Sequence, residues 1–365
     1  MTGATRLAPR PGVLDIEPYV GGRSRLDDRK RVIKLSANEG ALGPSPRAVE
    51  AYKKAAAEMQ RYPDGACAEL RAAIGRRFGL EPERIVCGAG SDELLTLLAR
   101  AYAGPGHEVL HTEHGFLMYP IIARSVGATP VAVPETGLKA DLDQLCAKVT
   151  ESTRIVYLAN PNNPTGSYLS ADELERLRAR LPDRVLLAID AAYAEFVTRD
   201  DYAPGIDLVD GGDNVVMTRT FSKIFALAGL RLGWAYCPPG IAGVLNRLRM
   251  PFNVTAPAQA AGVAALEDVA FTDAARAHNE KWRDWLGDKL VEIGLRVDPS
   301  AANFVLVRFP DEPDRNARAA EQFLNAKGII PRRLGRYGLN QCLRITVGLE
   351  DEMKAVADAL AEFMA

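Results

Sequence analysis

Short unbroken runs of hydrophobic residues alternate along this chain with longer segments of helical period. Such runs indicate strands of a parallel sheet covered on both faces, because neither side of these strands meets water. They lie at 85–87, 109–110, 129–133, 154–159, 185–189, 215–217 and 230–236. Helices are expected at 46–59, around 70–78, after 91, and at 117–126, 141–149 and 172–180. Because strands that alternate with helices are joined by right-handed crossovers, the pattern predicts an α/β fold with a mostly parallel sheet flanked by helices.

The pattern changes toward the end of the chain. A helical segment at 257–293, interrupted near Phe271, is followed by strands at 304–309 and 343–347 and helices at 314–327 and 350–364. These elements predict a smaller α+β domain. We therefore expect an N-terminal arm (1–40) that joins the small domain, a large cofactor-binding domain (41–285) and a small C-terminal domain (286–365), with the ligand in the cleft between the domains.

Polar residues follow three of the predicted strands. Asn163 comes after the run at 154–159, Asp190 and Tyr193 follow the run at 185–189, and Ser222 and Lys223 follow the run at 215–217. In open α/β sheets, ligands bind at the carboxyl ends of the strands. The three strand ends therefore predict a single site.

Lys223 and Arg231 indicate the chemistry of that site. A lysine amine can form an imine with an aldehyde cofactor. An arginine eight residues further on can bind a phosphate through the N–H donors of its planar guanidinium group. Together they point to pyridoxal phosphate. The alternative for a lone lysine is a surface position in a polar loop.

Asp190 follows a buried run, so its carboxylate needs a partner. A pyridinium N–H is a suitable one, because a fixed negative charge keeps the ring a good electron acceptor. Tyr193 and Asn163 can hydrogen-bond the phenolate oxygen of the cofactor and so lower the pKa of the imine. The structural alternative is that Asp190 caps a turn and Tyr193 fills the core.

Further residues have both a functional and a structural interpretation. Gly90, Ser91 and Asp92 lie where a strand meets a glycine turn and a helix start, which favours anion binding or a plain helix cap. Phe116 can stack on a planar ring or pack in the core. Arg344 lies in an apolar strand and needs an anion, either a substrate carboxylate or a structural partner.

Composition narrows the class of protein. The 365 residues are 47% hydrophobic and 25% charged with a net charge of -2, which favours neither nucleic acid nor a membrane surface as partner. Five scattered cysteines without a C-x-x-C pair fit a reducing, cytoplasmic setting. His111 and His114 have no further ligand nearby in sequence, so we predict no metal.

The motifs resemble a known family along nearly the whole chain. Asn163-Pro-Thr-Gly166, Asp190-x-x-Tyr193, Ser222-Lys223 and Arg231 look like the fold-type I aminotransferases. Ser36-Ala-Asn-Glu39, Arg61-Tyr-Pro-Asp-Gly65, Gly90-Ser-Asp-Glu-Leu94, Arg219-Thr-Phe-Ser-Lys223 and Tyr337-Gly-Leu339 resemble histidinol-phosphate aminotransferase. The resemblance implies a pyridoxal 5'-phosphate enzyme, a homodimer with shared active sites, and amino-group exchange between histidinol phosphate and 2-oxoglutarate in histidine biosynthesis.

The resemblance also implies roles for single residues. Lys223 would carry the cofactor and move a proton, Asp190 would hold the pyridine nitrogen, and Phe116 would stack on the ring. The phenolate oxygen would be held by Tyr193 and Asn163. The cofactor phosphate would be surrounded by Gly90, Ser91, Asp92, Ser222 and Arg231, with Tyr62 from the neighbouring subunit. Substrate would be bound by Tyr19, Asn38, Asn163, Arg332 and Arg344.

Some positions depart from the family pattern. Gly40-Ala41 stand where Asn-Pro is usual, Ala191 replaces a glutamate, and His114-Gly-Phe116 replaces Pro-Thr-Tyr or Pro-Thr-Phe. These departures leave an aromatic amino acid aminotransferase open as an alternative, and a pyridoxal phosphate lyase and a threonine-phosphate decarboxylase are further alternatives. A catalytically silent effector-binding module would need an attached helix-turn-helix domain, for which the N-terminal arm is too short.

Overall fold

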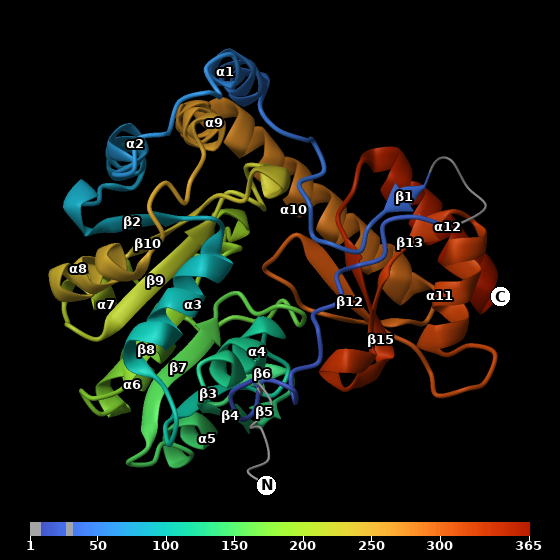
Figure 1. Ribbon diagram of the computed structural model, residues 1–365. Coiled ribbons are helices and arrows are strands. Elements are labelled where there is room, and N and C mark those ends of the chain that lie inside the picture. Colours follow the sequence, from blue (N-terminus) through green and yellow to red (C-terminus); the bar gives the residue numbers. More distant parts are fainter. Residues whose placement is uncertain (1–8, 27–31) are drawn as a thin grey trace, which may run out of the picture.

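The computed structural model describes residues 9–26 and 32–365 and is built around a seven-stranded sheet with the order β2-β10-β9-β8-β7-β3-β4 (Figure 1). Every neighbouring pair is parallel except those of β10, which is antiparallel to both β2 and β9. The strands are β2 (Ile85–Gly88), β3 (Glu108–Thr112), β4 (Thr129–Val133), β7 (Thr153–Ala159), β8 (Leu186–Asp190), β9 (Val215–Thr220) and β10 (Gly233–Tyr236). The predicted α/β fold with a mostly parallel sheet is confirmed.

The antiparallel strand β10 was not predicted. A parallel return needs a crossover, usually a helix, whereas the loop from β9 to β10 contains only the single 3-10 turn Ala228–Leu230. The chain therefore folds straight back beside β9. This short return keeps Ser222, Lys223 and Arg231 in one loop at the carboxyl end of β9.

Both faces of the sheet are covered by helices, which explains the unbroken hydrophobic runs. On β7, Ile155 and Tyr157 belong to one core cluster, while Val156 and Leu158 belong to the other. The first cluster includes α3 (Ser91–Tyr102), α4 (Met118–Ser125) and α8 (Pro239–Leu248). The second includes α1 (Pro46–Ala56), α2 (Ala68–Phe78), α5 (Leu142–Ala147), α6 (Ala171–Arg180), α7 (Ile206–Asp210) and α9 (Ala256–Glu267). The expected helices all form, with ends that differ by a few residues.

The C-terminal part has its own sheet and core. Its four strands are antiparallel in the order β11-β12-β15-β14, and α11 and α12 pack with them. The elements are α10 (Val269–Glu292), β11 (Arg296–Asp298), β12 (Phe304–Arg308), α11 (Ala317–Ala326), β14 (Arg332–Leu334), β15 (Leu339–Thr346) and α12 (Glu350–Met364). The long helix α10 runs from the large part into the small one (Figure 1).

The N-terminal arm joins the small part through a two-residue pairing. Strand β1 (Ile33–Lys34) lies parallel to β13 (Ile329–Ile330). The interruption of the predicted helix 257–293 falls at Asp268, between α9 and α10, three residues before Phe271. A small hairpin of β5 (Glu135–Thr136) and β6 (Lys139–Ala140) was not predicted. The domain limits 1–40, 41–285 and 286–365 stay a prediction.

Candidate active site

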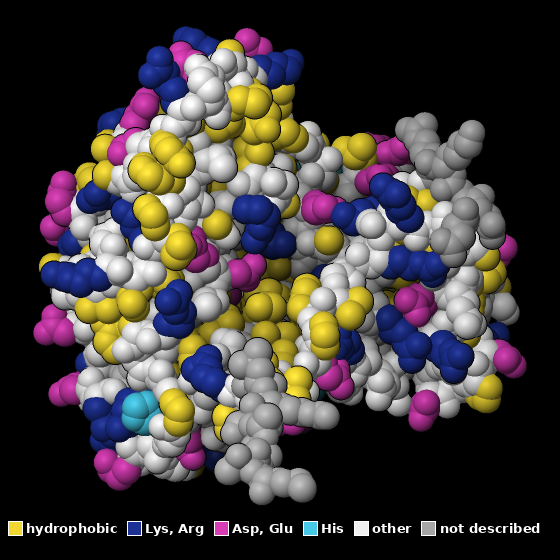
Figure 2. All heavy atoms as spheres, viewed as in Figure 1, with side chains coloured by type: hydrophobic (Ala, Val, Ile, Leu, Met, Phe, Trp, Pro, Cys, Tyr) yellow, Lys and Arg dark blue, Asp and Glu magenta, His cyan; other side chains and the backbone are white. Residues whose placement is uncertain are grey.

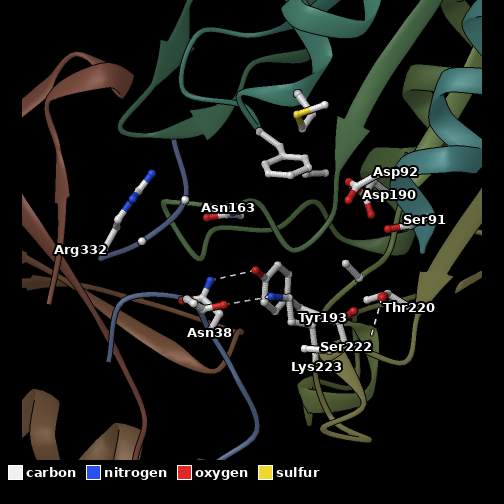
Figure 3. A pocket seen from close by; sticks show the side chains of 18 of the residues that line it. Asn38, Ser91, Asp92, Asn163, Asp190, Tyr193, Thr220, Ser222, Lys223 and Arg332 are labelled. Atoms are coloured by element: carbon white, nitrogen blue, oxygen red, sulfur yellow. Dashed lines mark hydrogen bonds between the residues drawn. The ribbon is translucent and has the colours of Figure 1, made fainter. Parts of the chain in front are cut away.

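A cavity of about 300 Å³ lies between the carboxyl ends of the large sheet and the strands β14 and β15 (Figure 3). It collects nearly all the side chains that the sequence singled out. Those that line it are Tyr19, Asn38, Ser91, Asp92, Phe116, Asn163, Asp190, Tyr193, Ser222, Lys223, Arg231, Arg332 and Arg344. Gly90 and Tyr62 do not line it. The three strand ends therefore meet in one place, as their sequence pattern predicted.

The register of the sheet explains this meeting. Ala159 of β7 lies beside Asp190 of β8, which lies beside Thr218 of β9. The polar residues that follow each strand thus leave the sheet at the same level. Lys223 lies in the loop just beyond β9 and reaches back toward Tyr193, its Nζ 5.7 Å from the centre of that ring.

Lys223 is a partly buried lysine whose amine lies at the wall of the cavity. Its Nζ donates a hydrogen bond of 3.2 Å to the carbonyl oxygen of Ala37. Burial, and then the nearby positive charge of Arg344, lower the pKa of Lys223 to about 8. At pH 7 about a tenth of the amine is therefore neutral, far more than for an ordinary lysine, and the neutral amine is the form that attacks an aldehyde.

Asp190 has one oxygen in use and one without a partner. Its Oδ2 accepts a hydrogen bond of 2.9 Å from Tyr119 Oη, while Oδ1 is buried and has no partner within the described residues. Burial raises the pKa of Asp190 to about 6. A buried carboxylate oxygen that borders the cavity and lacks a donor fits the ring N–H of pyridoxal phosphate, because that group would supply the missing hydrogen bond.

The start of α3 fits a phosphate. Gly90, its N-cap residue, has φ 83 and provides no side chain to cap the first helical amides, which leaves them available to an anion. The positive φ favours glycine at this position, and a Cβ there would lie 2.5 Å from Nη2 of Arg231, so the guanidinium would have to move. Arg231 pairs with Asp92 at 3.1 Å and donates to Ser222 Oγ at 3.4 Å. Gly90 thus shapes the site without lining the cavity.

Arg344 is a buried cation without an anionic partner among the described residues. It is 5% exposed, its Nη2 donates to the Ser36 carbonyl oxygen at 2.9 Å, and its Nη1 donates to Asn163 Oδ1. Its Nε is buried and unpartnered, and burial lowers its pKa. Since no structural ion pair accounts for this guanidinium, an anionic ligand in the cavity is the better of the two interpretations.

Arg332 brings a second cation to the cavity. It lies directly opposite Arg344 in the pairing of β14 with β15, and its Nη2 donates to the Val20 carbonyl oxygen at 2.8 Å. Tyr19 is 45% exposed, and its ring meets Phe116 edge-on at 6.3 Å. Arg332 and Tyr19 thus border the cavity beside the N-terminal arm.

Tyr62 lies outside the cavity on this chain. It is 83% exposed and stacks on Phe252 with ring centroids 4.6 Å apart. Sequence reasoning assigned it to the site of a neighbouring subunit, and that role stays a prediction.

Two departures from the family pattern have physical reasons. A Cβ at Gly40 would lie 2.8 Å from Cβ of Ala226 in the loop that carries Lys223, so a larger residue would displace that loop. Ala191 is fully buried in the core, where a glutamate would lose its water. His114 Nδ1–H donates to Oε2 of Glu135 at 2.9 Å, and this carboxylate raises the pKa of His114. Across residues 9–26 and 32–365, no group of three metal-ligating side chains is found.

Sequence reasoning missed several residues of the site. Thr220 lines the cavity, and its Oγ1 accepts the backbone N–H of Ser222 at 3.1 Å. Its position two residues before Ser222 in the chain could have pointed to it. Met118 also lines the cavity, but no sequence pattern marks it. The hydrogen bond from Tyr119 to Asp190 joins residues 71 positions apart and has no local signature.

The fold and this set of side chains define a class of protein. Residues 30–360 match the family described as "Aminotransferase class I and II", and the chain is a member of that class. It is 60% identical over 360 residues to the histidinol-phosphate aminotransferase of Paramagnetospirillum magneticum (99% of each chain) and 60% identical over 356 residues to that of Rhodospirillum centenum (98% of each).

A solved structure agrees with these relatives. The crystal structure of histidinol-phosphate aminotransferase from Sinorhizobium meliloti in complex with pyridoxal-5'-phosphate matches with a TM-score of 0.90 at 33% identity, covering 100% of this chain and 98% of that one. Within its class, the chain belongs to the histidinol-phosphate aminotransferase family.

Proposed function

We propose that this chain transfers an amino group between histidinol phosphate and 2-oxoglutarate, in the reaction that interconverts them with imidazole acetol phosphate and glutamate in histidine biosynthesis. The cofactor is pyridoxal 5'-phosphate. The observation that carries the chemistry is that the Lys223 amine and the unpartnered Oδ1 of Asp190 border one cavity. The activity of the close relatives supports the substrate.

Different residues of the cavity would bind different parts of the cofactor. Asp190 would accept the ring N–H, Tyr193 and Asn163 would hold the phenolate oxygen, and Phe116 would face the ring. The phosphate would bind at the start of α3, between Ser91 and the guanidinium of Arg231. When bound, pyridoxal phosphate supplies an aldehyde that takes up amino groups and a ring that withdraws electrons.

Lys223 has two tasks in this proposal. Its amine would hold the cofactor through the cofactor's aldehyde, and the same amine, when free, would accept and return a proton at the substrate α-carbon. Its pKa of about 8 suits both tasks, since the group can hold or release a proton near neutral pH. The partly buried position of Lys223 limits the access of water to that transfer.

Two cations would bind the two substrates in turn. Arg344 would bind the α-carboxylate of glutamate, and in the other half-reaction it would share the phosphate of histidinol phosphate with Arg332 and Tyr19. An aromatic amino acid aminotransferase is not favoured, because a phenylalanine side chain gives Arg332 no anion to bind. Membership of the chain in the histidinol-phosphate aminotransferase family also favours histidinol phosphate over an aromatic amino acid as the substrate.

The test of the substrate is a comparison of kcat/KM. Histidinol phosphate, phenylalanine and tyrosine would each be measured as amino donor with 2-oxoglutarate as acceptor. We expect histidinol phosphate to be preferred by about two orders of magnitude or more, since a desolvated phosphate bound by arginine carries several charge-assisted hydrogen bonds. A preference for phenylalanine would overturn the proposal.

A homodimer with shared sites is part of the proposal. Large hydrophobic side chains are exposed on and near α1 and just before α9, a region where Figure 2 shows hydrophobic atoms at the surface. They are Val49, Tyr52, Met59, Tyr62, Met250 and Phe252. A second copy of the chain would cover them and would bring its Tyr62 to the cofactor phosphate. The mass of the particle in solution, measured by light scattering, tests this; a monomer at micromolar concentration would contradict it.

No helix in the described part of the chain is long and apolar enough to cross a membrane. A cytoplasmic location stays a prediction.

A further inference from the structure

A chain of hydrogen bonds connects the small sheet with Tyr193. Thr346, the last residue of β15, accepts the backbone N–H of Asn38 at 3.0 Å, and its own hydroxyl donates to Asn38 Oδ1 at 3.2 Å. Asn38 Nδ2 then donates to Tyr193 Oη at 2.8 Å (Figure 3). Thr346 is 3% exposed and Asn38 is 1% exposed, so water does not compete for these groups.

These bonds have a fixed direction. A backbone N–H can only donate, so Thr346 Oγ1 must accept from it, and its single hydrogen is left for Asn38 Oδ1. With Oδ1 occupied, the Asn38 amide turns its NH2 group to Tyr193. An NH2 group can only donate, so Tyr193 Oη is the acceptor in that contact. The hydrogen of the Tyr193 hydroxyl is therefore free for an acceptor in the cavity.

The backbone at Asn38 holds this arrangement in place. Asn38 has φ 56, a left-handed conformation that asparagine tolerates better than most residues. Asn303, just before β12, donates from Nδ2 to the carbonyl oxygens of Asn38 and Glu39 at 3.1 and 3.2 Å. The backbone of Asn38 is thus anchored to the small sheet through its N–H, by Thr346, and through its carbonyl oxygen, by Asn303.

We propose that Thr346 is a positioning residue that, through the Asn38 amide, makes Tyr193 a hydrogen-bond donor to the phenolate oxygen of the bound cofactor. This inference rests on the proposed function, because the acceptor belongs to pyridoxal phosphate. A donor at that oxygen stabilises its negative charge, which lowers the pKa at which the lysine-bound cofactor takes up a proton. Through these hydrogen bonds, the small sheet would help to determine the pKa of the bound cofactor.

Loss of the Thr346 hydroxyl removes what fixes the amide. In Thr346→Val the shape of the side chain is kept, but Asn38 Oδ1 has no hydroxyl donor. The amide can then turn over and present Oδ1 to Tyr193, which would give its hydrogen to Asn38. The cofactor would lose a donor, and its pKa would rise.

The experiment is a pH titration of the absorbance of the bound cofactor, without substrate. The holoenzymes compared are wild type, Thr346→Val, Thr346→Ser and Thr272→Val. Thr272 is a matched control, because it is also 3% exposed, its hydroxyl donates at 3.3 Å to the Asp268 carbonyl oxygen, and it does not line the cavity. We expect the transition of Thr346→Val to move up by about half to one pH unit, the size of one net hydrogen bond. Thr346→Ser and Thr272→Val should titrate as wild type.

An unshifted Thr346→Val, or an equal shift in Thr272→Val, would overturn the proposal. Should Thr346→Val fail to fold or to retain cofactor, Asn38→Asp provides the second test. Its carboxylate can only accept from Tyr193, so the transition should again move up, and an unchanged titration would refute the role. A preference for phenylalanine as substrate would overturn the proposed reaction and leave these titrations valid, whereas a wild-type protein without cofactor absorbance would overturn both.

Discussion

Tyr119 Oη donates a hydrogen bond of 2.9 Å to Oδ2 of Asp190, and this contact leaves Oδ1 as the unpartnered oxygen of the carboxylate. Tyr119 is itself fixed, since it is fully buried and stacks on Tyr157 with ring centroids 5.0 Å apart. Tyr157 in turn donates to the Leu95 carbonyl oxygen at 2.7 Å. The phenol therefore both orients the carboxylate and favours its charged form.

Removal of that phenol should weaken cofactor binding at low pH. In Tyr119→Phe, Asp190 loses a donor that lowers its pKa, so we expect the pKa to rise above about 6 by roughly half to one unit. Fewer carboxylates would then be charged between pH 6 and 7. The dissociation constant of pyridoxal phosphate, measured from pH 5.5 to 8.5, should increase most at the acid end. A uniform increase at every pH would show that Tyr119 acts only through packing.

The buried carboxylate should also reduce the stability of the apoprotein. Burial raises the pKa of Asp190 from the usual 3.8 to about 6, so the folded apoprotein binds this proton more tightly than the unfolded chain does. The cost of the charge is complete above about pH 6 and disappears as the pH falls toward 3.8. Asp190→Asn should stabilise the apoprotein at pH 8 by up to about 3 kcal/mol and should make little difference near pH 4.

Chemical denaturation of both apoproteins at the two pH values measures this difference. Asn keeps an oxygen for Tyr119, so the hydrogen bond itself is not the variable. The same substitution should weaken cofactor binding, because the ring N–H loses its negative partner. A variant that is less stable than wild type at pH 8 would contradict the account of Asp190.

The sequence predicted the large sheet because strands that are buried on both faces appear in it as unbroken runs of hydrophobic residues. It did not predict the direction of β10, which depends on the shortness of the loop at 221–232 and not on the composition of the strand. The meeting of Asn163, Asp190 and Lys223 followed from one rule about strand ends. Where the position of a functional residue follows from the strand that precedes it, the local sequence pattern is sufficient to predict its place in the site.

Contacts between segments that are far apart in the chain have no such local sequence pattern. Thr346 meets Asn38 across 308 positions, and nothing in the spacing of either residue indicates the other. Arg344 was recognised only as a cation in an apolar strand. Its lack of an anionic partner in the described chain depends on every segment packed around it, so it emerges from the three-dimensional structure alone.

Lys223→Ala should abolish transamination and the absorbance of lysine-bound cofactor, because alanine has no amine to bond the aldehyde. In wild-type apoprotein, the rate of reconstitution with pyridoxal phosphate should rise with pH through a midpoint near 8, where the amine becomes neutral. Stopped-flow absorbance measures this rate. Full activity of Lys223→Ala, or a rate that does not change between pH 7 and 9, would refute the assigned role.

Mixed dimers test whether Tyr62 serves the neighbouring subunit. A Tyr62→Ala chain has an intact Lys223, and a Lys223→Ala chain has an intact Tyr62. If Tyr62 acts across the interface, a dimer of the two contains one complete site, so the mixture after refolding together should exceed the mean activity of its parents. If Tyr62 acts within its own chain, no site is complete, and the mixture should equal that mean.

Substitution of Arg332 and substitution of Arg344 should affect the two substrates differently. Arg344 is buried and hydrogen-bonded to Asn163, so Arg344→Ala should lower kcat/KM for glutamate and for histidinol phosphate by about a hundredfold or more. Arg332 is more exposed, so Arg332→Ala should cost about tenfold with histidinol phosphate and much less with glutamate, whose carboxylate is bound by Arg344. The neighbouring Arg333, on the same strand but outside the cavity, provides the control variant Arg333→Ala. Equal losses for both substrates in Arg332→Ala would show that Arg332 supports the N-terminal arm through Val20 and does not recognise the phosphate.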